Sequence, residues 1–375
     1  MLESVLLAGG GSAGHVNPLL AVADELRRRN PEVRVVVLGT AAGLEAELVP
    51  AQGYRLVTVP RVPLPRRPTL DWFRLPGRLR AAVRAAGRAI DESGAQVVVG
   101  FGGYVATPAY LAARRRGVPV VIHEQNARPG LANRLGARWA RAVAVTFPGT
   151  PLRGAQVTGL PLRPQIADLV ALRQRDAGRA RADAAALLDL DPALPTVLVT
   201  GGSLGAQSLN TAVSRVAAEL LAAGAQVLHL TGTGKADAVR TAVAAATRDA
   251  MPGVAERYQV REYLAQMHQA LAVADLVVAR SGAGTVSELA ALGLPAVYVP
   301  LPIGNGEQRL NAGPVVRAGG GVLVADADLT PQWLRSHVIP LLADPERLAA
   351  MGAAARTVGV NDGAARVADL VEELA

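Results

Sequence analysis

Short, strongly apolar runs alternate with longer alanine-rich stretches along the whole chain. Runs such as SVLLA at 4–8 and TVLVT at 196–200 are typical of buried strands, because both of their faces are apolar. The alanine-rich stretches between such runs are typical of helices. This alternation predicts an α/β fold in which parallel sheets are covered by helices.

The two halves of the chain repeat the same arrangement. SVLLA leads into GGGSAGHVNPLLAVADEL, and TVLVT leads into GGSLGAQSLNTAVSRVAAEL. Later in each half, VVVGFGGYVATPAYLAARRRGVPVVIHEQN starts at Val97 and LVVARSGAGTVSELAALGLPAVYVPLPIGN starts at Leu276. Each copy reads as strand, glycine turn and helix, so we expect two doubly wound, Rossmann-like domains in tandem.

The proline-rich segment GLPLRP at 159–164 predicts the hinge between the two domains. We therefore expect a first domain at 1–161, a second at 162–358, and a C-terminal helix at 359–375 that packs back on the first. Ligands of such sheets bind beyond the carboxyl ends of the strands. If the domains face each other across a cleft, all four glycine turns surround it, which suits an enzyme that joins two substrates.

Composition narrows the class of protein. A chain of 375 residues is expected to form two domains, and its lack of cysteine excludes disulfides, thiolate metal sites and cysteine nucleophiles. The first residues, MLESVLLAGGG, carry an acid where a signal peptide carries a basic residue. The longest uncharged stretches, near 97–113 and 192–214, are broken by Gly, Pro and polar residues, so we expect no membrane span.

Charge is distributed unevenly along the chain. Residues 1–160 hold 21 Arg and 10 acidic residues, whereas residues 161–375 hold 18 Lys and Arg and 21 acidic residues. A basic first half suggests contact with nucleic acid or with an anionic membrane surface. Aromatic residues make up only 3% of the chain and no nucleic-acid-binding motif is present, which disfavours nucleic acid as a partner.

The most basic stretch, 61–90, contains eight Arg and a single acid, Asp71. Arginines around exposed aromatic residues are typical of a protein that lies on a membrane surface. The predicted membrane contacts are Trp72, Phe73, Arg74, Leu75, Arg78 and Leu79. The alternative is a helix with solvated arginines whose apolar side packs on the core, namely Leu79, Ala82, Val83, Ala86 and Ile90.

The first glycine turn, Gly9-x-Gly11-x-x-Gly14, formally matches the dinucleotide fingerprint. A nicotinamide site also needs an acid at the end of the second strand, and the next acid here is Glu45, several residues further on. A P-loop is excluded because Lys235 is followed by Ala rather than by Ser or Thr. What remains is a turn that suits an anion at a helix start.

The segment SGAGTVSE at 281–288 is a sharper candidate site. Its small residues let backbone amides approach a diphosphate at a helix N-terminus, where the helix dipole favours negative charge. Glu288, one turn further, is placed to accept hydrogen bonds from both hydroxyls of a ribose, and Gln308 supports this interpretation. The alternative is that Thr285 and Glu288 form a capping box.

No metal or cofactor is expected. The pairs Asp189/Asp191 and Asp326/Asp328 fall where turns or helix caps are predicted, and carboxylates are not clustered elsewhere. A helix terminus and an arginine such as Arg163 would then neutralise a diphosphate without Mg²⁺.

Three side chains are candidates for a general base. His15 follows the first glycine turn, and a histidine of ordinary pKa accepts a proton near neutral pH. His123 and Glu124 end a predicted strand in the sequence HEQN. For all three the alternative is that they only hold their loops by hydrogen bonding.

The ordered motifs resemble one known family. GGGSAGHVNP, GFGGYV, HEQN, GLPLRP, GGSLGAQSLN, SGAGTVSELAALGLPAVYVP and the later Glu307-Gln308 occur in the order seen in the MurG family. These enzymes are UDP-N-acetylglucosamine–N-acetylmuramyl-(pentapeptide) pyrophosphoryl-undecaprenol N-acetylglucosamine transferases. The resemblance implies a GT-B fold, an acceptor-binding first domain and a donor-binding second domain.

The resemblance also implies which residues contact UDP-GlcNAc. By position in the matching motifs they are Ser12, Ala13, Gly14, Asn126, Arg163, Ser203, Leu264, Ala283, Gly284, Thr285, Val286, Ser287, Glu288 and Gln308. The chain departs from the family in two places. Ala13 stands where the family has Gly, and the loop 301–306 is less polar than usual.

The implied reaction is a metal-independent transfer of N-acetylglucosamine, with inversion, to the C4 hydroxyl of lipid I, which yields lipid II. The implied partners are UDP-GlcNAc, a polyprenyl-diphosphate-linked muramoyl pentapeptide and the anionic cytoplasmic face of the membrane, where the protein would be peripheral. Rival interpretations are a GT-B enzyme acting on another glycolipid or a natural product, a UDP-sugar epimerase, and a non-catalytic nucleotide-sugar-binding module.

Overall fold

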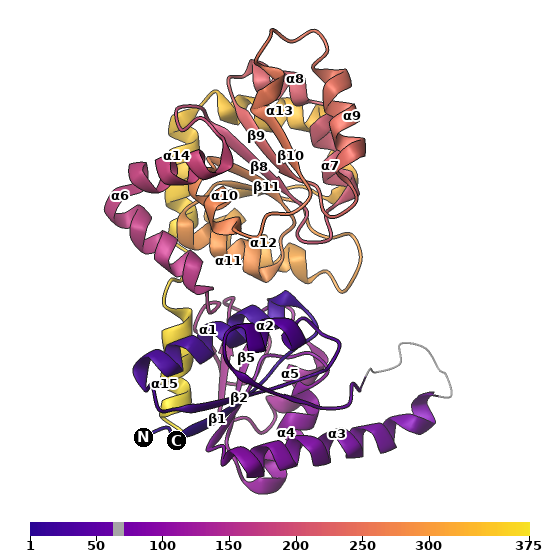
Figure 1. Cartoon of the computed structure of the whole chain (residues 1–375), viewed down its shortest axis with the longest axis vertical. Coiled ribbons are helices and arrows are strands. Elements are labelled where there is room, and N and C mark those ends of the chain that lie inside the picture. Colours follow the sequence, from indigo (N-terminus) through magenta and orange to yellow (C-terminus); the bar gives the residue numbers. More distant parts are fainter. Residues whose placement is uncertain (63–70) are drawn as a thin grey trace. The chain divides into compact units, whose positions relative to one another are not determined.

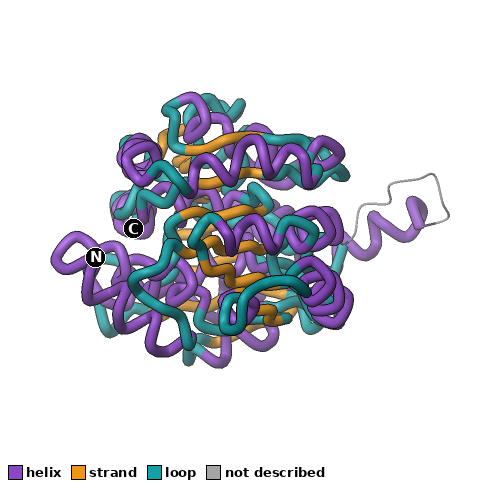
Figure 2. Tube along the Cα trace, turned by 90° about the horizontal axis from the view of Figure 1, so that it is seen from above, coloured by secondary structure: helices purple, strands orange, loops and turns teal. Residues whose placement is uncertain are grey.

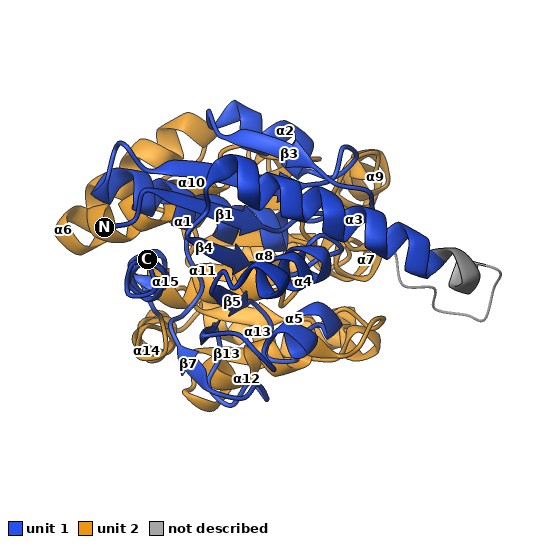
Figure 3. Cartoon of the chain, turned by 90° about the horizontal axis from the view of Figure 1, so that it is seen from below, with its two compact units in different colours: residues 1–164, 360–375 blue, residues 165–359 orange. Residues whose placement is uncertain are grey.

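The computed structural model describes residues 1–62 and 71–375, without the side chains of residues 71–74. The chain divides into two compact units, coloured separately in Figure 3. Unit 1 comprises Met1–Pro164 and Val360–Ala375, and unit 2 comprises Gln165–Gly359.

Unit 1 is built on a seven-stranded parallel sheet (Figure 1). Its strand order is β3 (Arg55–Thr58), β2 (Arg34–Gly39), β1 (Ser4–Ala8), β4 (Val97–Gly100), β5 (Val120–Glu124), β6 (Ala142–Val145) and β7 (Ala155–Val157). The order reverses direction between β1 and β4, which makes the carboxyl ends of these two strands the switch point where ligands of such sheets bind.

Helices cover both faces of this sheet because its strands are apolar on both faces. Val5 and Leu7 of β1 face the core formed with α1 (Ala13–Arg29), α2 (Glu45–Ala51) and α15 (Gly363–Glu372). Leu6 and Ala8 face the opposite core, formed with α3 (Asp71–Ser93), α4 (Ala106–Arg116) and α5 (Leu131–Gly136).

The C-terminal helix α15 packs on α1, although the two helices stand at opposite ends of the sequence. Val367 and Val371 are fully buried, and each such burial contributes about 1.5–3 kcal/mol. Arg29 adds ion pairs with Asp369 at 2.6 Å and Glu372 at 2.7 Å. The last helix is therefore part of the packing of unit 1.

Unit 2 contains a six-stranded parallel sheet. Its order is β10 (Tyr258–Arg261), β9 (Gln226–Leu230), β8 (Thr196–Thr200), β11 (Leu276–Ala279), β12 (Ala296–Tyr298) and β13 (Gly321–Leu323). The surrounding helices are α6 (Pro164–Leu188), α7 (Gln207–Ser214), α8 (Ala217–Ala222), α9 (Ala236–Ala246), α10 (Met267–Val273), α11 (Ala283–Leu292), α12 (Glu307–Arg317), α13 (Pro331–Leu342) and α14 (Pro345–Arg356). Figure 2 shows strands enclosed by helices in this way.

The predicted α/β fold with two Rossmann-like sheets is confirmed. The repeated motif appears as β1, glycine turn and α1 in unit 1, and as β8, glycine turn and α7 in unit 2. The second repeat appears as β4 with α4 and as β11 with α11. In the described part of the chain, no helix is both long and apolar enough to cross a membrane.

Candidate functional site

Four loops meet at the carboxyl edge of the unit 1 sheet. The turn after β1 packs against the turn after β4 so closely that a Cβ on Gly103 would lie 2.6 Å from the Gly10 carbonyl oxygen. Gly103 has a φ of +79°, which favours glycine for a second reason. Gly103 of GFGGY is therefore required by the meeting of two backbones, whereas Gly100 leaves room for the Tyr110 ring.

His15 lies in the first turn of α1, half-buried beside these loops. Its Nδ1 is 3.1 Å from Ser12 Oγ, and a Cβ on Gly102 would lie 3.2 Å from its Nε2. Burial lowers the pKa of His15, while a hydrogen bond to the Gly10 backbone and the charge of Glu45 act in the opposite direction. The imidazole is therefore neutral at neutral pH, which is the form that accepts a proton.

His123 lies at the end of β5 and is fully buried. Its Nε2 donates to the Gly159 carbonyl oxygen at 2.9 Å, and its Nδ1 accepts from Gln125 Nε2 at 3.1 Å. Burial lowers the pKa of His123 to about 4. Both ring nitrogens thus serve the structure of the strand end and its loop.

Glu124 is also buried, and both carboxylate oxygens have partners. Oε1 accepts from the Asn126 amide at 3.0 Å, and Oε2 accepts from the Gly130 amide at 3.0 Å and from Asn133 Nδ2 at 2.9 Å. Burial raises the pKa of Glu124, although these hydrogen bonds oppose the rise. The carboxylate fixes the loop that carries Asn126.

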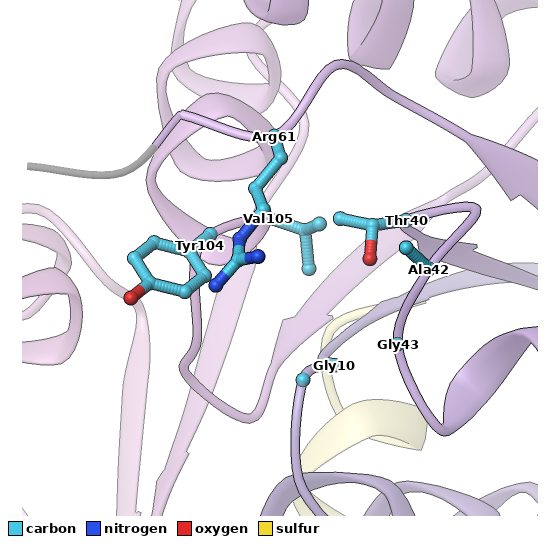
Figure 4. Close-up of a pocket in the computed structure, with 8 residues that line it drawn as sticks. Gly10, Thr40, Ala42, Gly43, Arg61, Tyr104 and Val105 are labelled. Atoms are coloured by element: carbon cyan, nitrogen blue, oxygen red, sulfur yellow. The ribbon is translucent and has the colours of Figure 1, made fainter.

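A small cavity of about 60 Å³ opens between the loops after β1, β2, β3 and β4 (Figure 4). Thr40, Arg61 and Tyr104 line it together with backbone of the glycine turn. The Arg61 guanidinium lies 4.7 Å from the centre of the Tyr104 ring, a cation–π contact. The sequence singled out Arg61 only as the first residue of the basic stretch 61–90 and did not indicate that it meets Tyr104 at this edge.

The glycine turn after β8 in unit 2 leaves Ser203 exposed. The ammonium of Lys235 donates to the carbonyl oxygen of Leu204 in this turn at 2.7 Å. A Cβ on Gly205 would lie 1.9 Å from the Thr231 carbonyl oxygen, so this glycine too is required by backbone packing. Lys235 is the only lysine in the chain, and it places a positive charge at this turn.

Helix α11 begins at Ala283, with Gly282 as its N-cap residue and no side chain capping it. Thr285 is therefore inside the helix, so the capping-box alternative for Thr285 and Glu288 is wrong. Glu288 is half-buried one turn into the helix. Ala283 and Val286 are buried, and the Val286 amide donates to the Gly282 carbonyl oxygen at 3.0 Å.

The other unit 2 candidates lie on loops or at helix starts. Gln308 is in the first turn of α12, and its Oε1 accepts from the Leu301 amide at 3.0 Å, which fixes the loop before the helix. Leu264 is half-buried in the loop before α10. Arg163, which belongs to unit 1, is half-buried just before α6.

One aspartate of each Asp-x-Asp pair has a structural partner. Asp326 pairs with Arg280 and accepts from Ser208 Oγ at 2.5 Å, while Asp191 accepts from the Ala193 amide at 2.8 Å. Asp189 ends a helix with a φ of +58°. Across residues 1–62 and 71–375, no three His, Asp or Glu side chains are grouped as metal ligands.

The predicted membrane contacts divide into two groups. Trp72, Phe73 and Arg74 lie outside the residues whose side chains the structure describes. Arg78 is exposed on α3, Leu75 is half-buried, and Leu79 is half-buried against the core. The apolar side that the sequence predicted for this helix is buried.

A second, wider hollow of about 470 Å³ lies on α5 and the segment before β7. Arg134, Arg138 and Arg153 line it together with Leu131 and Leu152. All three arginines are exposed, and no acidic residue occurs between Glu124 and Asp168. Unit 1 therefore carries exposed arginines on α3 and also on and after α5.

Two family models match the sequence in order. Residues 5–145 match the glycosyltransferase family 28 N-terminal domain, and residues 196–367 match the glycosyltransferase family 28 C-terminal domain. Together they cover most of the chain; the first spans β1 to β6 and the second spans β8 to β13.

Relatives match along almost their whole length. The chain is 58% identical over 369 residues to the UDP-N-acetylglucosamine–N-acetylmuramyl-(pentapeptide) pyrophosphoryl-undecaprenol N-acetylglucosamine transferase of Clavibacter sepedonicus, covering 98% of this chain and 95% of the relative. It is 53% identical over 358 residues to the Streptomyces coelicolor protein of the same name, covering 96% and 94%.

Solved structures agree. Acinetobacter baumannii MurG matches 99% of this chain and 99% of its own, with a TM-score of 0.77 at 28% identity. A UDP-GlcNAc 2-epimerase from Neisseria meningitidis, solved with UDP-GlcNAc, has a TM-score of 0.70 over 99% of this chain and 100% of its own, but at 14% identity it shares the fold alone. The resemblance to the MurG family is thereby confirmed, and the chain belongs to glycosyltransferase family 28.

Proposed function

We propose that the protein transfers N-acetylglucosamine from UDP-GlcNAc to the C4 hydroxyl of the muramoyl pentapeptide of lipid I, forming lipid II. The observation that carries this proposal is the similarity, over nearly the full length, to N-acetylglucosamine transferases of the MurG family. The identity to the Clavibacter sepedonicus transferase is 58%. Both domains of such an enzyme are present in one chain, which suits a reaction between two substrates.

The donor is assigned to unit 2. The start of α11, without a side-chain cap, suits a diphosphate, since the amides of Ala283, Gly284 and Thr285 point out of a helix N-terminus. Glu288 would accept hydrogen bonds from the ribose, and Gln308 would hold the sugar. The charge of Lys235 at the neighbouring glycine turn adds to the attraction for UDP.

The remaining donor contacts are proposed from the family resemblance. They are Ser12, Ala13, Gly14, Asn126, Arg163, Ser203, Leu264, Val286 and Ser287. The exposure of Ser203 and of the first turn of α1 is compatible with this role.

We assign the general base to His15 rather than to His123 or Glu124. His15 is half-exposed and neutral, whereas both nitrogens of His123 and both oxygens of Glu124 are engaged inside unit 1. The acceptor C4 oxygen would bond to the anomeric carbon as the bond from that carbon to the β-phosphate oxygen breaks. His15 would take the hydroxyl proton, and amides at the turns would stabilise the departing UDP.

The acceptor is lipid-linked, so we propose that unit 1 rests on the anionic cytoplasmic face of the membrane as a peripheral protein. The exposed arginines of α3 and α5 support this proposal, because basic residues near an anionic surface attract it. Apolar Leu131, which is 65% exposed beside the α5 arginines, suits contact with lipid.

The function is tested by incubating the protein with labelled UDP-GlcNAc and a short-chain lipid I analogue, with and without excess EDTA. We expect labelled disaccharide in both cases, because we propose that no metal is required. Formation of UDP-N-acetylmannosamine without acceptor would instead indicate an epimerase. Loss of transfer with EDTA, restored by Mg²⁺ or Mn²⁺, would refute the metal-independent mechanism.

A further inference from the structure

Glu45 is a charged side chain with no accessible surface, directly behind the first glycine turn. It is the first residue of α2, and its carboxylate points back toward the end of β1. Oε2 accepts from the Gly11 amide at 2.8 Å, and Oε1 accepts from the Thr40 amide at 2.9 Å and Thr40 Oγ1 at 2.7 Å.

Three glycines leave room for this carboxylate. A Cβ on Gly10, Gly39 or Gly43 would lie 2.3, 2.5 or 2.1 Å from the Glu45 side chain. Gly10 lies in the turn after β1, Gly39 is the last residue of β2, and Gly43 lies in the loop before α2. Part of the glycine pattern therefore accommodates a side chain of the protein itself.

The carboxylate is ionised at neutral pH. Burial acts to raise the pKa of Glu45, but hydrogen bonds from Gly11 and Thr40 outweigh it, so the pKa lies below its ordinary value. A buried carboxylate with three donors is held firmly, because breaking any of these bonds would leave a charge unsatisfied.

His15 lies one helical turn beyond the segment that Glu45 holds. Gly11 immediately precedes Ser12, whose Oγ is 3.1 Å from His15 Nδ1 and whose carbonyl oxygen accepts from the His15 amide at 3.0 Å. A displacement of Gly11 would therefore move the residue that orients the imidazole. The Glu45 charge also acts on His15 through space and favours its protonated form.

We propose that Glu45 is a positioning residue for the transfer reaction, which holds the Gly11 turn so that His15 is oriented to accept the acceptor proton. It also removes the Gly11 amide from the donors available to an anionic ligand. The proposal rests on the proposed transfer and on the role of His15 in it, and it assigns no contact between Glu45 and substrate.

The test uses Glu45→Gln, which keeps the size of the side chain and removes its charge. Glu47→Gln is the matched control, because Glu47 is on the same short helix and exposed. We expect Glu45→Gln to lower kcat by about tenfold to a hundredfold, the cost of a misplaced catalytic group. Glu47→Gln should match the wild type.

Proton NMR supplies a readout that does not depend on turnover. The chain contains five histidines, and the His15 signal is identified by its loss in His15→Gln. The pKa of His15 should be lower in Glu45→Gln than in the wild type, because a nearby negative charge has been removed. The acidic limb of the kcat/KM profile should move to lower pH with it.

A second variant, Glu45→Asp, replaces the glutamine variant if that one does not fold. It keeps the charge but shortens the side chain, so that the carboxylate no longer reaches Gly11. It should lose kcat while retaining a His15 pKa closer to that of the wild type. Full activity in either variant would overturn the proposal, as would a fall in thermal stability with unchanged kcat per folded molecule. Failure of the wild-type protein to transfer sugar would instead refute the proposed function. The NMR titration would still report the coupling between Glu45 and His15 in that case, so the two failures can be told apart.

Discussion

The glycine turns after β1 and β8 occupy the same place in two similar sheets, yet they are held by opposite charges. In unit 1 the buried carboxylate of Glu45 accepts from the Gly11 amide, and in unit 2 the ammonium of Lys235 donates to the Leu204 carbonyl oxygen. The first arrangement disfavours an anion at Gly11, whereas the second favours an anion nearby. Two turns with similar sequences therefore differ in the ligand that they suit.

The local charges oppose the overall charges of the two halves. The first 160 residues are strongly basic, but an acid lies behind their first glycine turn, and the second half is slightly acidic, but its only lysine lies at the equivalent turn. Many arginines of unit 1 lie on helices such as α3 and α4, although Arg61 lines the cavity beside the turn. Net charge thus describes the surface that we propose rests on a membrane, and single side chains describe the proposed ligand sites.

The largest expected effect comes from His15. His15→Gln should lower kcat by about 10²–10⁴-fold, because the acceptor hydroxyl loses its general base. In the wild type, activity should fall as pH drops through the pKa of His15, which burial places below 6.5. Steady-state kinetics across pH measures both effects. His337→Gln, a change at an exposed histidine, is the control, and an equal loss there would contradict the assignment.

The surface charge of unit 1 is tested by vesicle binding. Replacing Arg78, Arg80 and Arg84 with Glu should weaken binding to anionic vesicles by about 1 kcal/mol or more for each arginine. Transfer to full-length lipid acceptor should fall, while transfer to a short-chain analogue is retained.

A matched triple variant in unit 2 controls for the change in net charge. Arg175, Arg215 and Arg248 are exposed and can be replaced with Glu in the same way. Vesicle binding should fall less in this variant. Equal loss of vesicle binding in the two triple variants would mean that only net charge matters. Equal loss of transfer to the full-length and the short-chain acceptor would mean that the α3 arginines stabilise the fold or contact the acceptor headgroup.

The sequence predicted the fold well because the fold depends on patterns that repeat. Each strand, glycine turn and helix appears twice, and apolar runs at this spacing leave few alternatives to parallel sheets. The return of Glu45 to the first turn was not predicted. Its position in the sequence excluded a nicotinamide site, but a contact between α2 and the end of β1 depends on tertiary packing that no local pattern records.

Other parts of the candidate site were missed or misjudged for similar reasons. The capping-box alternative at Thr285 assumed that the helix starts there, whereas it starts two residues earlier, at Ala283. The pairing of Arg280 with Asp326 joins segments far apart in the sequence. We assign different roles to His15 and Glu124 because their burial and hydrogen-bond partners differ, and the sequence alone does not give these.

A substitution at Glu288 tests the proposed UDP-GlcNAc site in unit 2. Glu288→Gln should lower kcat/KM for UDP-GlcNAc by roughly 1–3 kcal/mol, because an amide has fewer acceptor positions for ribose hydroxyls than a carboxylate. Thermal stability should change little, since the residue does not cap α11. Unchanged UDP binding together with a lower melting temperature would show that Glu288 only stabilises the helix.

The smallest expected effect is at Lys235 and bears most directly on the opposite charges of the two turns. Lys235→Met removes the ammonium from the Leu204 carbonyl oxygen and should weaken UDP binding by about 0.5–1 kcal/mol, a modest figure because the side chain is partly exposed. Lys235→Arg should restore most of the affinity, and Arg240→Met, on the helix that Lys235 precedes, should leave it unchanged. Calorimetric titration with UDP at low and high salt measures the difference, which should shrink as salt screens the charge. A loss of affinity that does not depend on salt would mean that Lys235 acts only by fixing the turn, and the opposite charges of the two turns would then have no part in ligand choice.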